Sequence, residues 1–215
     1  MSRIALWLST AIVALALGGC ATPIPLNNLT YPGAVTVKTS KSAEVKVVTG
    51  AVRGGSGTTM LPAGGILVPI SSGPIPKLQF NSADQEEFGE SLRAELVRLG
   101  MTRAASSKNP DADIAIAVLF AQTYHNPSLQ VYTLDVVVQI TGGDQPAVHQ
   151  YRVISNEGDS FWEKMNTDAY EGKAKAARLL LGKIIPDVEE YLRANPGMRR
   201  AESVNVSLLD VRSVR

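Results

Sequence analysis

The segments "SADQEEFGESLRAELVRLG", residues 82–100, and "IAIAVLFA", residues 114–121, differ in their hydrophobic period. In the first, large apolar residues recur at spacings of four and three, which predicts a helix with one buried face: Phe88, Leu92, Leu96 and Leu99. In the second, larger apolar residues alternate with small ones over the length of a strand. The chain is therefore expected to pack a helix against a sheet.

The ends of the first helix have recognisable signals. Ser82 and Gln85 have the spacing of a capping box, and acidic residues follow in the first turn, where the helix dipole favours negative charge. Gly100 is expected to end the helix in the left-handed conformation.

Two further strands are predicted after the first. "LQVYTLDVVVQI", residues 129–140, is rich in β-branched and aromatic residues, and "AVHQYRVIS", residues 147–155, alternates. The turns are assigned to "HNPS", residues 125–128, and to "TGGDQP", residues 141–146. Short connections between consecutive strands predict an antiparallel meander.

A second long helix is expected to begin after Thr167 and Asp168 and to end at "NPG", residues 195–197. Pro186 is expected to kink this helix or to start a second segment. Its apolar stripe is formed by Ala177, Leu180, Leu181, Ile184 and Ile185.

An alternating stretch that includes Val35, Val37, Val45 and Val47 predicts a strand before the first helix. The predicted fold class is α+β, with a mostly antiparallel sheet and two helices packed on one face. We assign residues 35–195 to this single domain and residues 196–215 to a poorly ordered C-terminal tail.

The N-terminus has the pattern of an export signal. After Arg3, residues 4–17 carry no charge. This run is shorter than the roughly 20 residues that a membrane-spanning helix needs. Residues 1–19 are therefore predicted to be a signal peptide that is removed.

The residues that follow resemble the lipobox of bacterial lipoproteins: Leu17, Gly18, Gly19 and Cys20. A thiolate is a strong nucleophile, so the thiol of Cys20, the single cysteine, can accept a diacylglyceryl group. The resemblance implies cleavage before Cys20, acylation of the freed amine, for example with palmitate, and firm anchoring by two or more chains. Because Ala21 rather than Asp follows, it favours the periplasmic face of the outer membrane of a Gram-negative cell.

Two alternatives to lipidation remain open. Residues 14–16, "ALA", match an ordinary signal-peptidase site, and cleavage there would release a soluble protein with a free Cys20. In the other alternative, Cys20 is a small apolar residue of an anchor that is not cleaved.

The composition of the mature chain excludes some functions. The chain has 21 Lys and Arg against 20 Asp and Glu, and loss of residues 1–19 removes only Arg3. This balance argues against nucleic acid, which needs a basic face, and against electrostatic binding to anionic lipid. Residues 20–34 hold three prolines and no hydrophobic period, so they are predicted to be a lipidated, extended linker.

Residues 53–76 are rich in glycine and proline around an apolar patch: Ile66, Leu67, Val68 and Ile70. A phosphate-binding loop is excluded because no lysine occurs between Lys46 and Lys77. The patch is interpreted in one of two ways. It belongs to a long flexible connection, in which it forms a short strand or lies on the core, or it is an exposed loop that docks on a partner or enters lipid.

The sequence contains no clear catalytic or metal-binding motif. His125 and His149 are taken as exposed polar residues rather than metal ligands, since a metal site needs several converging ligands. The oxygen-rich stretch 155–162 is interpreted as a polar turn rather than a calcium site. No nucleophile elbow occurs, so neither catalytic residues, a cofactor nor a metal is predicted.

Phe161 and Trp162 follow a polar turn and have two possible roles. They close the core, or they anchor a partner protein.

The order "SLRAELVRLGMTR", "NPDADIAIAVLF", a hairpin and "AKAARLLLGKII" resembles small outer-membrane lipoproteins of the YajG kind and related domains of the curli secretion lipoprotein. The likeness covers about residues 80–194 and departs at residues 53–76. It implies a non-catalytic binding or assembly module that contacts other envelope proteins. The alternatives are a carrier or sensor for a lipid or glycan ligand and, third, an envelope hydrolase.

Overall fold

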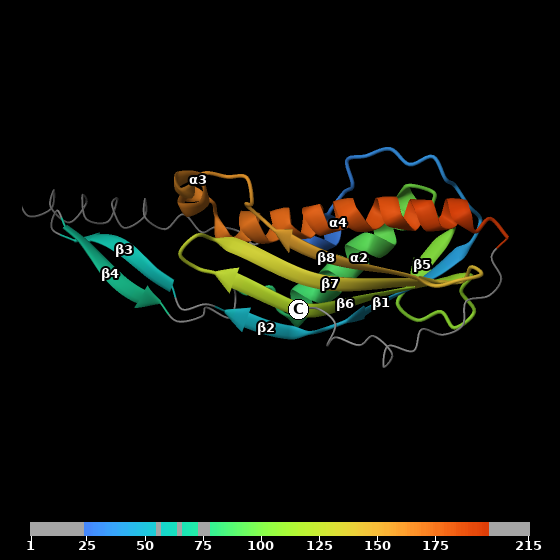
Figure 1. Cartoon of the computed structure of the whole chain (residues 1–215), viewed down its shortest axis with the longest axis horizontal. Coiled ribbons are helices and arrows are strands. Elements are labelled where there is room, and N and C mark those ends of the chain that lie inside the picture. Colours follow the sequence, from blue (N-terminus) through green and yellow to red (C-terminus); the bar gives the residue numbers. More distant parts are fainter. Residues whose placement is uncertain (1–23, 55–56, 64–65, 73–77, 198–215) are drawn as a thin grey trace, which may run out of the picture.

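The computed structural model of the 215-residue chain describes residues 24–54, 57–63, 66–72 and 78–197. Its elements form one mixed sheet, a separate hairpin and a helical layer (Figure 1). In chain order they are η1 (Leu26–Asn28), β1 (Ser42–Val48), β2 (Ala51–Gly54), β3 (Gly57–Ala63), β4 (Ile66–Ser72), α2 (Ser82–Arg98), β5 (Ala104–Ser106), β6 (Ile114–Asn126), β7 (Val131–Thr141), β8 (Ala147–Ile154), α3 (Phe161–Asn166) and α4 (Ala169–Ala194).

The main sheet has the strand order β5-β1-β6-β7-β8, and β2 continues beyond β1 as a second partner of β6. Strands β6, β7 and β8 form the antiparallel meander that the sequence predicted. The N-terminal strands β1 and β2 and the short β5 add to it in parallel pairs. The α+β class is confirmed, but the sheet is mixed rather than mostly antiparallel, because three of the five strand pairings described in it are parallel. The parallel pairings are possible because α2 provides the crossover between β1 and the next strands.

Helix α2 has the predicted buried stripe but a different cap. Asn81, not Ser82, is the N-cap, and its side chain accepts hydrogen bonds from the backbone N–H groups of Ala83 and Asp84. The carboxylate of Asp84 accepts from the backbone N–H of Asn81, which completes the capping box one residue earlier than predicted. Gly100 has φ +72° and provides the expected left-handed stop.

Helix α4 runs without interruption through Pro186, so no second segment starts there. The side chain of Asp168 caps its N-terminus and Asn195 ends it, as predicted. The predicted apolar stripe is buried.

The core lies between the sheet and these two helices. Helix α2 packs on the side of β1 and β5, and α4 packs on the side of β7 and β8. Phe120 of β6 contacts Phe80 and Phe88 at ring-centroid distances of 5.7 and 5.8 Å. Ile116, Leu134, Leu180 and Ile184 are buried in the same cluster.

Strand β6 is longer than predicted. It continues through His125 and Asn126, so the prediction of a turn beginning at His125 is wrong. The register shifts between Phe120 and Gln122, where Ala121 forms a bulge. The bulge returns Thr123 and His125 to the buried face, which is how a histidine near a turn becomes part of the interior.

The glycine-rich stretch contains a β-hairpin rather than an irregular loop. Strands β3 and β4 pair antiparallel in their own two-stranded sheet. Figure 1 shows this hairpin beyond one end of the main sheet. None of the helices that the structure describes is both long and apolar enough to cross a bilayer.

Candidate functional site

The four lipobox residues, Leu17, Gly18, Gly19 and Cys20, lie outside the described residues, as do residues 198–215 of the predicted tail. The apolar patch at Ile66, Leu67, Val68 and Ile70 lies on β4, in agreement with the interpretation of this segment as a short strand. Its backbone pairs with β3 and not with the main sheet.

Phe161 and Trp162 do not close the core. They begin α3, and 58% of Phe161 and 70% of Trp162 are exposed. Their rings contact each other edge to face with centroids 5.5 Å apart. Figure 1 places α3 at the same end of the long axis as the β3–β4 hairpin. We call this end, with α3 and strands β3 and β4, the docking end.

A polar turn positions these two aromatic residues. The hydroxyl of Ser160 accepts a hydrogen bond from the backbone N–H of Glu163, whose carboxylate accepts from the N–H of Ser160 at 2.7 Å. Asp159 pairs with Lys175 of α4 at 2.8 Å. Asp159 and Ser160 of the oxygen-rich stretch are thus engaged in an ion pair and in capping, in line with the polar turn that the sequence predicted. The side-chain amide of Asn156 in the same stretch is buried and has no hydrogen-bond partner among the described residues.

The predicted linker is partly a fixed element. Leu26 and Leu29 are buried against α2. The backbone N–H of Leu26 donates to Glu87 Oε2 at 3.0 Å, that of Leu29 to Ser91 Oγ at 3.0 Å, and that of Tyr31 to Glu95 Oε2 at 3.3 Å. Residues 24–31 therefore belong to the folded domain, rather than to an extended linker that ends at residue 34.

The chain stays attached after Tyr31. Glu189 Oε1 accepts hydrogen bonds from the backbone N–H and the hydroxyl of Thr36, both at 2.7 Å. These bonds lower the pKa of the Glu189 carboxyl. Arg193 Nη2 donates to the same oxygen at 3.1 Å. The segment before β1 thus binds α2 through its first part and α4 through its second.

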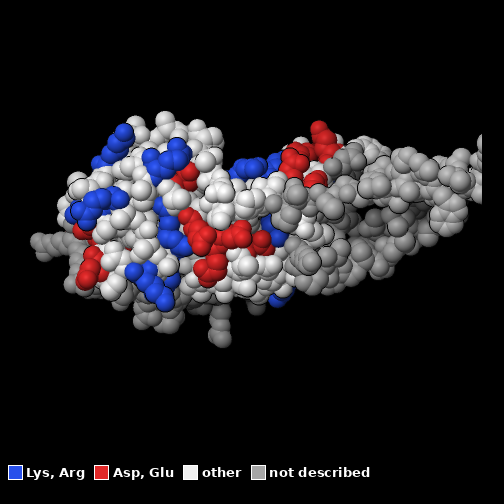
Figure 2. Space-filling model, turned by 180° about the vertical axis from the view of Figure 1, so that it is seen from behind, with Lys and Arg blue, Asp and Glu red and all other residues white. Residues whose placement is uncertain are grey.

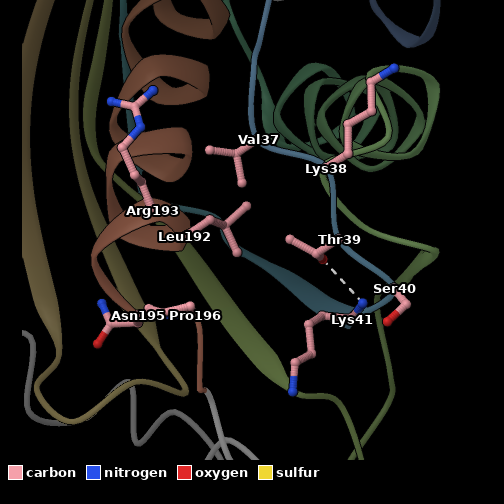
Figure 3. A pocket seen from close by; sticks show the side chains of 9 residues that line it. All are labelled: Val37, Lys38, Thr39, Ser40, Lys41, Leu192, Arg193, Asn195 and Pro196. Carbon is pink, nitrogen blue, oxygen red and sulfur yellow. Dashed lines mark hydrogen bonds between the residues drawn. The ribbon is translucent and has the colours of Figure 1, made fainter.

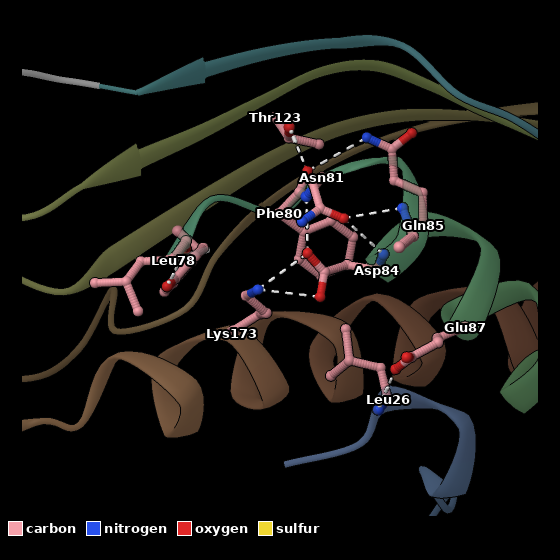
Figure 4. Close-up of polar contacts among 11 residues, drawn as sticks. Leu26, Leu78, Phe80, Asn81, Asp84, Gln85, Glu87, Thr123 and Lys173 are labelled. Carbon is pink, nitrogen blue, oxygen red and sulfur yellow. Dashed lines mark hydrogen bonds and ion pairs between the residues drawn. The ribbon is translucent and has the colours of Figure 1, made fainter. Parts of the chain in front are cut away.

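A buried ion pair joins the two long helices at their N-terminal ends (Figure 4). Lys173 Nζ lies 3.0 Å from each carboxylate oxygen of Asp84, and the two side chains are 6% and 15% exposed. Burial raises the pKa of Asp84, although the charge of Lys173 acts in the opposite direction. This pair was not predicted from the sequence, although Lys173 interrupts the apolar stripe of α4, four residues before Ala177.

Neighbouring polar groups fix the chain that leads into α2. The carbonyl of Phe80 accepts from the hydroxyl of Thr123 at 2.9 Å and from Gln85 Nε2 at 3.4 Å (Figure 4). The hydroxyl of Tyr132 donates to the carbonyl of Leu78. Each of these polar groups has a backbone or side-chain hydrogen-bond partner, so the cluster stabilises the chain that leads into α2.

The structure does not bring the two histidines together. His125 pairs with Tyr132 of β7 and His149 pairs with Val138, six residues further along the same strand, or about 20 Å at 3.3–3.4 Å per residue. His125 is buried rather than exposed, which corrects its predicted role, and it stacks on Tyr132 at 4.4 Å. No group of three His, Cys, Asp or Glu residues within the described ranges is placed to hold a metal ion.

His149 takes part in a different contact. Its Nδ1 lies 3.2 Å from Asp187 Oδ2 on α4, and the hydroxyl of Tyr151 donates to the same oxygen. Burial and the bond to Asp187 raise the pKa of the Tyr151 phenol. These contacts fasten edge strand β8 to the helical layer.

A groove of about 400 Å³ lies between the segment before β1 and the C-terminal end of α4, and Figure 3 shows its lining. Lys38, Lys41 and Arg193 flank it, but the figure shows their charged ends pointing apart. Lys41 is 3.7 Å from Asp113, and Arg193 pairs with Glu189. This arrangement does not form a converging site for an anion.

A second groove, of about 500 Å³, lies on β6, β7 and β8 beside the bulge at Ala121. Asp135 and Arg152, whose charged atoms are 3.6 Å apart, are among its lining residues. The pair is partly exposed, so it is worth at most about 1 kcal/mol.

One face of the molecule carries charges of both signs (Figure 2). On the face seen from behind, Figure 2 shows acidic side chains gathered near the middle and basic side chains spread around them. This distribution agrees with the nearly neutral composition of the chain. The features that remain as a candidate functional site are the aromatic pair and the hairpin of the docking end.

No family model and no curated protein matches the sequence. A solved Xanthomonas campestris structure of family DUF330 is 10% identical, with a TM-score of 0.42, and the match covers 80% of this chain and 95% of that chain. A solved structure described as an uncharacterized protein is 12% identical, with a TM-score of 0.36, covering 73% of this chain and 98% of that one. Such scores assign neither a family nor a function.

Proposed function

We propose that this chain is a lipid-anchored lipoprotein on the periplasmic face of the outer membrane, and that it acts as a non-catalytic binding or assembly module of the cell envelope. The lipobox at residues 17–20 supports the anchor, and the YajG-type resemblance supports the assembly role. The partners are the membrane, through Cys20, and other envelope proteins, through the docking end.

One observation carries the docking role: the exposed aromatic pair Phe161 and Trp162 at the end of the molecule that also holds the hairpin. Aromatic side chains are enriched in protein interfaces because they bury a large area at low entropic cost. Because 70% of Trp162 is exposed, its side chain contributes little to the stability of its own domain. The two segments that the sequence nominated for docking, residues 66–70 and 161–162, thus share one end.

The alternative of a ligand carrier is less well supported. A carrier is expected to enclose an apolar ligand in a cavity. The grooves beside α4 and on β6–β8 instead open onto the surface. We therefore favour docking of a protein partner over transport of a lipid or glycan.

The docking role is tested by crosslinking in intact cells. A photoreactive amino acid replaces Trp162 in one variant and Val148, which is 53% exposed on β8, in the control variant. We expect position 162 to crosslink a defined envelope protein, identified by mass spectrometry, and position 148 to give none of that product. Phe161→Ala in the same background should weaken the product.

Equal crosslinking from both positions, or none from position 162, would contradict the docking role. Thermal unfolding of each variant is the control for folding. Because both positions are exposed, we expect changes of no more than about 0.5 kcal/mol.

A further inference from the structure

A third groove, of about 660 Å³, lies between the N-terminal segment and the exposed face of α4. Thr30, Tyr31 and Pro32 form one wall. Leu179 and Gly182 lie on the helix side, where Leu179 is 42% exposed and a Cβ added to Gly182 would meet no atom within 4 Å. The groove is therefore open and partly apolar.

Three cations line the same stripe of α4: Lys175, Arg178 and Lys183. Their spacings of three and five residues, together with Leu179 and Gly182, place them on one side of the helix. Lys175 is paired with Asp159, whereas Arg178 and Lys183 are exposed and form no ion pair with any residue in the described ranges. A guanidinium and an ammonium beside an apolar floor suit a phosphate that carries hydrocarbon.

The N-terminal segment connects this groove to the proposed anchor through a short stretch of chain. Ile24 already packs against the core, so only residues 21–23 separate Cys20 from the folded domain. At no more than 3.6 Å per residue, the Cα atom of Cys20 lies within about 14 Å of that of Ile24. From Leu26 to Tyr31 the segment then follows Glu87 to Glu95 along α2, about 12 Å at 1.5 Å per residue.

We propose that this groove binds the headgroup of an anionic phospholipid in the bilayer that holds Cys20. Leu179 reaches the interfacial layer, and Arg178 and Lys183 extend to lipid phosphates while their aliphatic stems cover the groove. The proposal rests on lipidation of Cys20. The balanced charge of the whole chain predicted no attraction to anionic lipid, but this stripe of α4 has a local excess of positive charge.

Depth-dependent fluorescence quenching tests the contact. When Cys20 carries lipid, an introduced cysteine is the sole free thiol of the chain, because the sequence contains no other. The lipidated full chain, carrying Leu179→Cys or Val148→Cys with a fluorescent label, is reconstituted into vesicles of phosphatidylethanolamine and phosphatidylglycerol. Brominated phospholipid in the vesicles is the quencher. Val148 is the matched control because it is similarly exposed but lies on β8 and does not line this groove.

We expect brominated lipid to quench the label at position 179 strongly and the label at position 148 weakly. Arg178→Glu with Lys183→Glu should reduce quenching at position 179, since each basic residue near an anionic surface contributes about fivefold to binding. Phosphatidylglycerol-free vesicles should have the same effect as the two substitutions.

Equal quenching at both positions would overturn the proposal, as would an unquenched label at position 179 in chains that remain with the vesicles. Crosslinking of position 179 to another protein in cells, without quenching by lipid, would assign the groove to a protein partner and also overturn it. A mature chain whose mass lacks the diacylglyceryl group would contradict the anchor itself. The last result is distinguishable because Cys20 would then also take up the thiol label.

Discussion

Lys173 Nζ lies 3.0 Å from both carboxylate oxygens of Asp84, although 89 residues separate the two in sequence. The pair joins the first turn of α2 to the first turns of α4, and both side chains are largely shielded from water. Removing one partner of a buried pair leaves the other charge without compensation.

Lys173→Met is therefore expected to lower the free energy of unfolding by about 3 kcal/mol, as seen by urea denaturation. The matched control is Lys175→Met, because Lys175 and Asp159 are 41% and 30% exposed and should contribute at most about 1 kcal/mol. If Lys173→Met costs no more than Lys175→Met, the buried pair does not stabilise the helical layer as proposed here.

His125 is expected to make stability depend on pH. Burial lowers the pKa of this imidazole below its ordinary value of 6.5, and the positive charge of Lys173 acts in the same direction. The unfolded chain thus binds a proton more readily than the folded one. The contribution of neutral His125 to the free energy of unfolding is fully present above pH 6.5. It is lost as the pH falls from 6.5 through the pKa of His125 in the folded state.

An NMR titration of the His125 ring protons measures this pKa directly. We expect a midpoint below 6.5, and His125→Gln should flatten the stability profile over the same range. A midpoint at or above 6.5 would show that the ring is not shielded from water.

Leu26→Ala tests whether the N-terminal segment belongs to the domain. Leu26 is buried against α2, so its truncation should cost about 2–5 kcal/mol in the free energy of unfolding. The neighbouring Asn27→Ala, at an exposed position, should change stability by less than about 0.5 kcal/mol. If both substitutions change the free energy of unfolding by equally small amounts, residues 24–31 are a linker and not part of the domain.

Gly50→Ala tests the close approach between the β1–β2 junction and β6. A Cβ atom on Gly50 would lie 1.4 Å from the carbonyl oxygen of Phe120, so the backbone must move. We expect a loss of about 1–3 kcal/mol or more. Gly158→Ala is the control, since nothing lies within 4 Å of its added Cβ. A melting temperature that falls equally in both variants would contradict the contact.

Local patterns predicted the elements whose signals lie within a few residues. The spacing of Phe88, Leu92 and Leu96 located α2, and Asp168 located the start of α4. The meander followed from short turns between β-rich runs. In each case, neighbours in the sequence determine the structure.

Contacts between distant segments could not be derived in the same way. The parallel pairing of β1 with β6 depends on the crossover through α2, and the burial of His125 depends on a bulge four residues earlier. The attachment of residues 26–31 rests on backbone N–H groups that donate hydrogen bonds to Glu87 and Glu95. Hydrogen bonds from the backbone cannot be recognised from the types of the residues that make them. Leu26 and Leu29, spaced by three in a proline-rich segment, were the available signal.

The proposed docking role was the hardest feature to predict from the sequence. Exposure of Phe161 and Trp162 is a property of the fold, because the same residues after the same turn also fit a core-closing role.

The membrane anchor is the claim on which both proposals depend, and the intact mass of the mature chain purified from membranes tests it most directly. We predict an N-terminus at Cys20 whose mass includes a diacylglyceryl thioether and an amide-linked acyl chain. A chain that begins at Leu17 and carries no lipid would contradict it.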